Sequence, residues 1–421
     1  MTISAMPQTR DQFRVPLFPA PREAAGRKPP LSVRVALIGN YLPRLCGIAT
    51  FTTRIHEALR EVMPMAAADV YAMVDPGRSY RFPSTVTGTI AQQDRESYRA
   101  AGRAIRARRS DILWVQHEFG IFGGPAGNYL FDLLDQTDAP VAVTLHTVLA
   151  NPTLDQRLVM DRLTNRAAII IVMADRARTI LTQTYDVPAA KITVISHGVP
   201  DRPYVEPSVA RRRSAIEDRR TILTFGLLSP DKGIETMIRA MPRILSRNPG
   251  VLYRVLGATH PHLVAHEGEA YRAGLQTLAA TLGVSNALRW ENRFVNEAEL
   301  LDQLAAADIY VTPYRNPAQI TSGTLAYAAG LGKPIIATPY VHATELLAGG
   351  RGRIIEFDDV SALAETVGSL LNDDLTRDHM ARAIYAHSRR MTWHCMVERV
   401  MERFEAIVHP ETEIVLVAVR S

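Results

Sequence analysis

The stretch PYRNPAQITSGTLAYAAGLGKPIIATPYVHATE, residues 313–345, decides the fold of this chain. It follows the β-branched run 309–312, which is typical of a buried parallel strand. Polar residues 321–324 offer an N-cap to the alanine-rich helical segment 325–329, a glycine and a proline end that helix, and 334–338 begins the next strand. Free N–H groups at such a helix start suit a phosphate, although any α/β unit has this outline without a ligand.

The same alternation of strands and helices extends along the chain on both sides of this stretch and predicts parallel, doubly wound sheets. In the first half we expect strands near 33–39, 69–74, 86–90, 112–116, 140–145, 168–172 and 191–195, and helices near 48–62, 92–108, 126–135, 154–165 and 174–184. In the second half we expect strands near 221–225, 251–257, 286–290, 308–312, 334–338 and 353–356, and helices that include 234–245, 297–306, 359–371 and 394–408.

The length of 421 residues predicts two domains rather than one core. Residues 1–30 contain six prolines and five basic residues, which predicts a disordered arm. We expect one Rossmann-like domain at 31–204 and another at 218–389, joined by a polar linker at 202–219. The C-terminal helical segment, about 390–421, could pack back on the first domain.

Composition limits the classes of protein that the chain can represent. Apolar residues make up 47% of it and charged residues 22%, as in soluble globular proteins. We find neither a run of transmembrane length nor a secretory signal, and the two cysteines, Cys46 and Cys395, favour a reducing cytoplasm over a disulfide framework. The net charge of +5 weakly favours anionic ligands or a membrane surface.

Candidate site residues follow the predicted strands, where a doubly wound sheet binds ligands. Gly47 lies at a helix start after the first strand, and two further strands end in His117-Glu118 and in His146. Lys232 precedes a glycine at the start of a helix, where it can add a positive charge to the helix dipole. Each has an ordinary alternative: a tight turn, a satisfied structural histidine or an exposed lysine. Two neighbouring strand ends that each carry a histidine favour a functional reading.

Taken together, these junctions resemble the retaining glycosyltransferases of family 4, the group 1 type with the GT-B fold. The resemblance covers about 33–408 and is most specific at 226–233 and 319–338. Gly47 matches the glycine loop of the family's first domain, and His146 matches its active-site histidine. The resemblance implies two Rossmann-like domains with doubly wound parallel sheets that face each other across a cleft.

Several residues depart from the family pattern. Lys232 is present, but Leu227 stands where the family has an arginine that holds the donor diphosphate, and lysine does not replace a bidentate clamp. Gln319 and Tyr327 stand where the family has two glutamates, the first for the donor sugar and the second for the ribose. Gln319 can still hydrogen-bond a sugar hydroxyl, and Tyr327 can pack on the ribose. Glu345 matches a further family glutamate.

The resemblance implies an enzyme that moves a hexosyl unit, with retention, from a nucleotide-diphosphate sugar to a saccharide or glycolipid acceptor. Its alternatives are a retaining phosphorylase on the same fold and a non-catalytic sugar-nucleotide binder. The implied residues are Lys232, Gln319, Ser322, Gly323, Thr324, Tyr327 and Glu345 for the donor, Gly47, His117 and Glu118 for the acceptor, and His146, Lys232 and Gln319 for catalysis. We expect Gln319 and His146 to face each other across the cleft, with neither needed by its domain core.

Partners follow from the same reading. Neither Asp-x-Asp nor a His/Cys cluster occurs, so we expect no metal and no cofactor beyond the nucleotide sugar, and no nucleic acid. We expect a cytoplasmic protein. Arginines at helical spacing within 92–108 also allow peripheral contact with an anionic inner membrane face, although a solvated helix face is the simpler reading; they are Arg95, Arg99, Arg103 and Arg106.

Overall fold

The computed structural model describes residues 33–214 and 216–410. The predicted arm at 1–30 and the end of the predicted C-terminal segment, 411–421, lie outside the described residues. None of the helices in the described part is long and apolar enough to cross a membrane.

The first domain is built on a seven-stranded parallel sheet with strand order β3-β2-β1-β4-β5-β6-β7. Its strands are β1 (Val35–Gly39), β2 (Ala68–Val74), β3 (Val86–Ala91), β4 (Ile112–His117), β5 (Val141–Leu145), β6 (Ile169–Val172) and β7 (Ile192–Val194). Its helices are α1 (Gly47–Val62), α2 (Arg95–Ala107), α3 (Leu130–Leu134), α4 (Leu154–Arg166) and α5 (Asp175–Thr184).

The second domain is built on a six-stranded parallel sheet with strand order β10-β9-β8-β11-β12-β13. Its strands are β8 (Thr221–Phe225), β9 (Leu252–Leu256), β10 (Leu288–Glu291), β11 (Ile309–Thr312), β12 (Ile335–Ala337) and β13 (Arg353–Ile354). Its helices are α6 (Pro207–Arg213), α7 (Ile234–Arg247), α8 (Pro261–Glu267), α9 (Ala270–Thr281), α10 (Glu297–Ala306), α11 (Gly323–Gly330), α12 (Val341–Leu346), α13 (Val360–Asn372) and α14 (Asp374–Ser388).

The central strands of both sheets are apolar, as expected where helices cover both faces of a parallel sheet. Every residue of β1, β4, β5 and β8 is buried. In each sheet the chain order reverses beside the first strand of the domain, between β1 and β4 and between β8 and β11. The carboxyl ends of strands at such a reversal form the ligand-binding crevice of doubly wound folds. The predicted doubly wound parallel sheets are confirmed.

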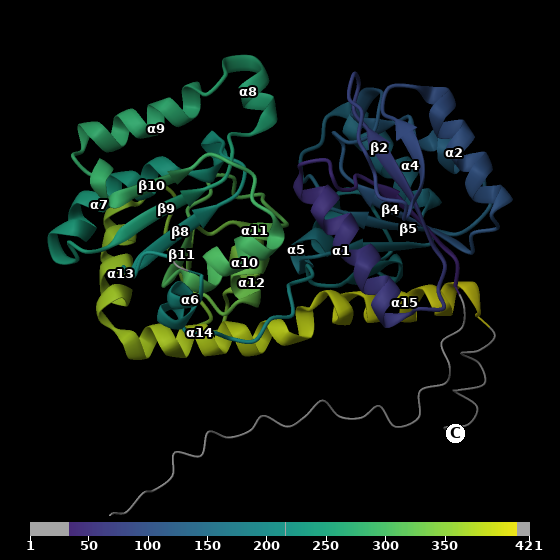
Figure 1. Cartoon of the computed structure of the whole chain (residues 1–421). Coiled ribbons are helices and arrows are strands. Elements are labelled where there is room, and N and C mark those ends of the chain that lie inside the picture. The colour runs from purple at the N-terminus through teal and green to yellow at the C-terminus, as the bar shows by residue number, and fades with distance from the viewer. Residues whose placement is uncertain (1–32, 215, 411–421) are drawn as a thin grey trace, which may run out of the picture. The chain divides into compact units, whose positions relative to one another are not determined.

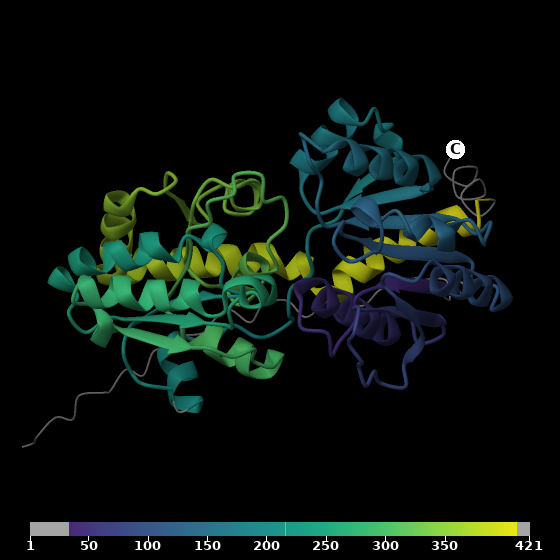
Figure 2. The same ribbon diagram turned by 90° about the horizontal axis from the view of Figure 1, so that it is seen from above.

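The last helix, α15 (Trp393–Val408), follows α14 in sequence but packs on the first domain. Figures 1 and 2 show α14 and α15 in yellow, passing from the second domain to the first. Phe404 of α15 meets Trp114 of β4 edge-on, with ring centroids 5.3 Å apart. Both side chains are fully buried, so α15 forms part of the core of the first domain.

The segment predicted as a polar linker, 202–219, contains a helix that is packed on the second domain. Arg211 of α6 is only 5% exposed. Its guanidinium pairs with Asp308 at 2.8 Å and donates to the backbone oxygen of Ala306, at the C-terminal end of α10. A cation at a helix C-terminus is favourable. One buried arginine therefore attaches the polar segment 202–219 to the second domain.

The basic stripe of α2 is largely engaged in ion pairs. Arg95 and Arg99 both bond Asp132 of α3, and Arg103 bonds Glu96 of the same helix. These pairs explain the helical spacing of the arginines through contacts within the domain. They reduce the charge available to an anionic surface, and contact with a membrane stays a prediction.

Candidate active site

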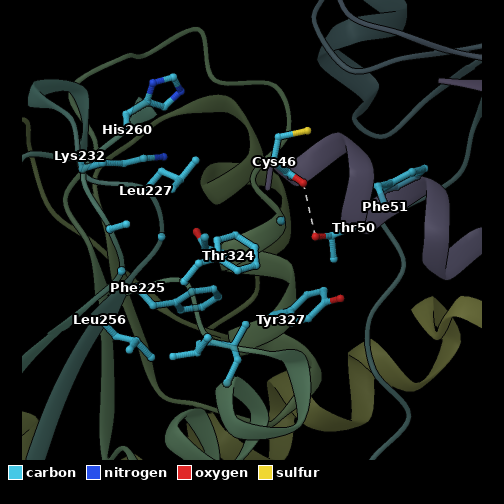
Figure 3. A pocket seen from close by; sticks show the side chains of 18 of the residues that line it. Cys46, Thr50, Phe51, Phe225, Leu227, Lys232, Leu256, His260, Thr324 and Tyr327 are labelled. Carbon is cyan, nitrogen blue, oxygen red and sulfur yellow. Dashed lines mark hydrogen bonds between the residues drawn. The ribbon is translucent and has the colours of Figure 1, made fainter. Parts of the chain in front are cut away.

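A cavity of about 320 Å³ lies where the two domains meet. The first domain contributes the head of α1, including Gly47 and Phe51, and the second domain contributes the loops that follow β8 and β9 and the start of α11. In Figure 3, Lys232 and Leu227 extend from the second domain towards Cys46 at the head of α1. The cavity therefore occupies the crevice that the two strand reversals predict.

Lys232 is held at the cavity by the turn that follows it. Gly233 has φ +61°, and any side-chain carbon there would lie 1.9 Å from the backbone oxygen of Pro313, so only glycine fits. The ammonium of Lys232 lies 3.9 Å from the centre of the Tyr314 ring. Burial alone raises the pKa of Tyr314, but the charge of Lys232 and a hydrogen bond with Thr324 outweigh it and lower that pKa.

The start of α11 lines the same cavity near Lys232. Ser322 is the N-cap, since its Oγ accepts from the backbone nitrogen of Leu325 at 3.3 Å. Its own backbone nitrogen donates to Nδ1 of His342 at 2.8 Å. Gly323 and Thr324 line the cavity, whereas Ser322 is buried behind them. Backbone N–H groups and the positive end of the α11 dipole thus reach the cavity close to Lys232.

Tyr327 lines the cavity from the next turn of α11. The carboxylate of Glu297 links its hydroxyl to the first domain. That hydroxyl donates to Glu297 Oε1 at 2.7 Å, and the other oxygen of Glu297 pairs with Arg54 of α1 at 2.6 Å. Burial, and then the charge of Glu297, raise the pKa of Tyr327 well above its ordinary value. The phenol therefore stays a hydrogen-bond donor at neutral pH.

Leu227 also lines the cavity, at the position where the family pattern has an arginine. The cations on the wall are Lys232 and Arg293, and Arg293 is paired with Glu299 and Glu291. None of the described residues that line the cavity is a carboxylate. The wall is otherwise largely apolar and aromatic, so the cavity suits a ligand that has both an anionic group and apolar faces.

Two residues predicted to reach the donor sugar lie away from the cavity wall. The side-chain amide of Gln319 donates to the backbone oxygen of Thr321 within its own loop. The carboxylate of Glu345, on α12, accepts from the backbone nitrogens of Asp175 and Arg176, both at 2.9 Å. Glu345 therefore caps the start of α5 in the first domain. Their roles towards the sugar stay predictions.

His146 was expected to be dispensable for its domain core, but the structure buries it there. Its side chain is buried, its Nε2 lies 3.1 Å from Gln116 Oε1, and its ring meets Phe51 edge-on with centroids 4.7 Å apart. Burial, and then the neighbouring histidines, lower the pKa of His146 to about 3, so the ring is neutral. Because Phe51 lines the cavity and His146 does not, His146 lies behind the wall.

His117 and Glu118 are also not on the cavity wall. His117 is fully buried at the end of β4, and its ring nitrogens have no hydrogen-bond partner among the described residues. Glu118 accepts from the hydroxyl of Thr147 and from the backbone nitrogen of Phe119. Burial raises the pKa of Glu118. Of the residues predicted for the site, the cavity brings together Gly47, Lys232, Gly323, Thr324 and Tyr327.

Two aromatic residues and a histidine line the cavity but were not among the site residues predicted from the sequence: Phe51, Trp393 and His197. His197 follows β7 just as His117 ends β4, so the same strand-end argument would have found it. Trp393 begins α15 and packs so tightly that a side-chain carbon at Gly198 would lie 2.0 Å from its ring. The contact across nearly two hundred residues leaves no local signal in the sequence.

Comparisons with known proteins agree with this geometry. Residues 47–202 match the model of glycosyltransferase family 4, and residues 208–387 match the model of glycosyl transferases group 1. The chain belongs to the group 1 glycosyltransferases of family 4. The predicted resemblance is therefore confirmed, and the boundary between the two matched regions falls within the segment that carries α6.

Among curated relatives of this family 4 chain, similarity is moderate. A D-inositol 3-phosphate glycosyltransferase of Corynebacterium efficiens is 28% identical over 246 residues, which are 56% of each chain. A GDP-mannose-dependent alpha-(1-6)-phosphatidylinositol monomannoside mannosyltransferase of Mycolicibacterium smegmatis is 26% identical over 52% of this chain and 56% of the other. The chain thus spans a little over half the length of these relatives.

Solved structures confirm the GT-B fold of this family 4 chain. Sucrose-phosphate synthase from Thermosynechococcus elongatus superposes with a TM-score of 0.72 at 16% identity, over 89% of this chain and 99% of the other. The Anabaena protein HepE in complex with UDP gives a TM-score of 0.71 at 16% identity, over 89% of this chain and all of the other.

No group of three His, Cys, Asp or Glu side chains in the described ranges is arranged to hold a metal ion. Whether the chain needs a cofactor beyond a nucleotide sugar stays a prediction.

Proposed function

We propose that this chain transfers a hexosyl unit, with retention, from a nucleotide-diphosphate sugar to a saccharide or glycolipid acceptor. The observation that carries the proposal is the shared wall formed by Lys232 and the start of α11, in a cavity that both domains line. A lysine beside free helix N–H groups suits a diphosphate. Family membership and relatives that are named for GDP-mannose or solved with UDP support a nucleotide sugar as the donor.

Lys232 and the α11 N-terminus would hold the diphosphate as negative charge develops on it. Fixed positive groups aimed at the leaving group stabilise the transition state more than the ground state, which speeds transfer. No carboxylate among the described wall residues offers a nucleophile, which favours displacement from the face of the leaving group. His146 would reach the reacting sugar after a movement of Phe51, which now separates it from the cavity.

A donor screen tests this proposal. The purified protein is incubated with UDP-, GDP- and ADP-hexoses, first with water and then with inositol phosphates, phosphatidylinositol mannosides and simple saccharides. We expect release of one nucleoside diphosphate that depends on the acceptor, and a product whose anomeric configuration, read by NMR, equals that of the donor.

Two other outcomes would replace the proposal. Formation of a sugar 1-phosphate from a saccharide and inorganic phosphate would show a phosphorylase, which needs no contact with a ribose and so tolerates Tyr327 in place of the family glutamate. Binding of a nucleotide sugar without turnover under any acceptor would show a binding protein.

A further inference from the structure

His197 presents a ring nitrogen to the start of α11 within the cavity. A side-chain carbon at position 323 would lie 3.3 Å from His197 Nε2, so this nitrogen sits against the first residue of the helix. Phe51 and Trp393 hold the ring, with centroids 5.1 and 5.4 Å from it. The imidazole is therefore fixed in position beside the proposed diphosphate site.

The hydrogen bonds of His197 determine which nitrogen carries its proton. Nδ1 lies 2.7 Å from the backbone oxygen of Gly198. A carbonyl oxygen only accepts, so Nδ1 is the donor and the neutral ring has its lone pair on Nε2. A lone pair aimed at the place where a diphosphate binds would repel phosphate oxygens, unless Nε2 takes up a proton.

The described residues around His197 supply one unpaired cation, Lys232, so a second cation could also contact a diphosphate in the cavity. Lys232 is the cation of the wall that has no carboxylate partner among the described contacts, and Leu227 stands where the family pattern has an arginine. The other titratable groups around the ring are Cys46, His260, Arg293 and Tyr327 on the cavity wall and His146 and His342 behind it.

We propose that His197 takes up a proton when a diphosphate binds and donates a charge-assisted hydrogen bond through Nε2, in place of the arginine absent at position 227. The inference rests on the proposed function, because it takes the ligand to be a nucleoside diphosphate. The proton moves from solvent to Nε2, and Nδ1 keeps its bond to Gly198.

Burial explains why the proton is absent before the ligand arrives. It lowers the pKa of His197 to about 4, against an ordinary 6.5, so the imidazole is neutral at physiological pH. A diphosphate in contact with Nε2 adds two or more negative charges at a poorly solvated place and raises that pKa. At a pH between the pKa values of His197 without and with the diphosphate, binding takes up one proton. The affinity then falls by up to about tenfold for each unit by which the pH rises.

Isothermal titration calorimetry tests this linkage in the full chain. UDP, GDP and ADP are titrated in turn, and the tightest binder is measured at pH 6.5, 7.2 and 8 in buffers of different ionisation enthalpy. We expect proton uptake of up to one per site, which declines as the pH rises. The terminal phosphate of the probe titrates near pH 6 and contributes alike to every variant.

Variants assign the proton to His197. His197→Gln should lose the uptake and bind about 10- to 100-fold more weakly at pH 6.5, the range for one charge-assisted bond. His379→Gln, at an exposed histidine of α14, should match the wild type. Adding Leu227→Arg to His197→Gln should restore affinity without proton uptake, because arginine is always charged.

The outcomes separate this inference from the proposed function. Tight binding without proton uptake in the wild-type protein would overturn the inference and leave the transferase proposal intact, and this measurement needs no variant to fold. Uptake that persists in His197→Gln would likewise overturn it. Failure of all three nucleotides to bind would overturn the donor assignment and the inference with it.

Discussion

Lys232 is a single ammonium group on which the proposed diphosphate site largely depends. Lys232→Ala should weaken donor binding by roughly 10- to 100-fold, since a hydrogen bond to a charged group contributes about 1.5–3 kcal/mol. Titration of the nucleotide and steady-state kinetics measure the effect. Arg239→Ala removes an exposed cation from the neighbouring helix α7 and should change neither. An unaltered donor affinity in Lys232→Ala would remove this lysine from the site.

His146 differs from Gln319 in what its loss should do to stability. His146→Ala leaves Gln116 buried without its partner, so we expect the free energy of unfolding to fall by about 1–3 kcal/mol, as for other unsatisfied buried groups. Gln319→Ala removes only a bond within a loop and should cost under about 0.5 kcal/mol. Urea unfolding of both variants measures these values.

Turnover assigns function to the same two side chains. If both act on one transition state, each alanine variant should lose turnover by about tenfold or more, and the double variant should lose less than the product of the two. Gln319→Glu, which restores the family residue, should keep activity. Normal turnover in both single variants would contradict their predicted roles.

At the scale of elements, the start of α5 depends on a side chain from the other domain. The N-cap residue of α5, Ala174, has no side chain that can cap, and Glu345 of α12 accepts from the first two backbone nitrogens instead. Glu345→Ala should therefore lower the free energy of unfolding by about 0.5–2 kcal/mol, the range for loss of an N-cap. Thermal unfolding measures the loss, with Asp359→Ala at the ordinary cap of α13 as a reference. Unaltered unfolding together with a raised donor KM would instead support the predicted contact with the sugar.

Elements that carry local signals could be predicted from the sequence. The β-branched runs gave the strands of both sheets, and Ser322 with its alanine-rich helix gave the start of α11. The contacts of Arg211 and Glu345 could not be predicted from the sequence, because their partners lie about a hundred or more residues away. A charged residue has the same local appearance whether it faces water or caps a distant helix, so only the tertiary structure distinguishes the two.

At the scale of the whole molecule, the five histidines that are buried in the described part of the chain make stability depend on pH. They are His56, His117, His146, His197 and His342, whose pKa values burial lowers to about 4, 4, 3, 4 and 3. Below the ordinary value of about 6.5 the unfolded chain binds protons that the folded chain excludes, so stability falls as the pH drops and is fully present above that value. Each histidine contributes up to about 1.4 kcal/mol per pH unit in this window.

Urea unfolding between pH 7.5 and 5 tests this dependence before most carboxylates titrate. We expect the free energy of unfolding to be level above about pH 7 and to fall steeply below about 6.5. His342→Gln should reduce the slope, and His379→Gln, at an exposed site, should leave it unchanged. A level profile down to pH 5 would mean that these rings do not resist protonation.

The hydrogen-bonded network Arg54–Glu297–Tyr327 joins the two domains at the edge of the cavity. Arg54 belongs to α1 of the first domain, Glu297 begins α10 of the second, and Tyr327 lines the cavity. The proposed donor contacts lie in the second domain, whereas the proposed acceptor side and His146 lie in the first. Breaking this network should therefore separate the catalytic groups while sparing the donor site.

Arg54→Gln should lower kcat by about tenfold or more and leave nucleotide affinity within about threefold, since misplacement of reacting groups costs rate more than binding. Tyr327→Phe keeps the ring that can pack on a ribose, so it should act in the same direction through the loss of one bond to Glu297. Because the two residues share that carboxylate, a double-mutant cycle on kcat should show a coupling of about 0.5–3 kcal/mol. Small-angle scattering should record a larger radius of gyration for Arg54→Gln than for Arg239→Ala. If Arg54→Gln lost nucleotide affinity at unaltered kcat, this ion pair would belong to the donor site, and closure of the two domains would have to depend on other contacts.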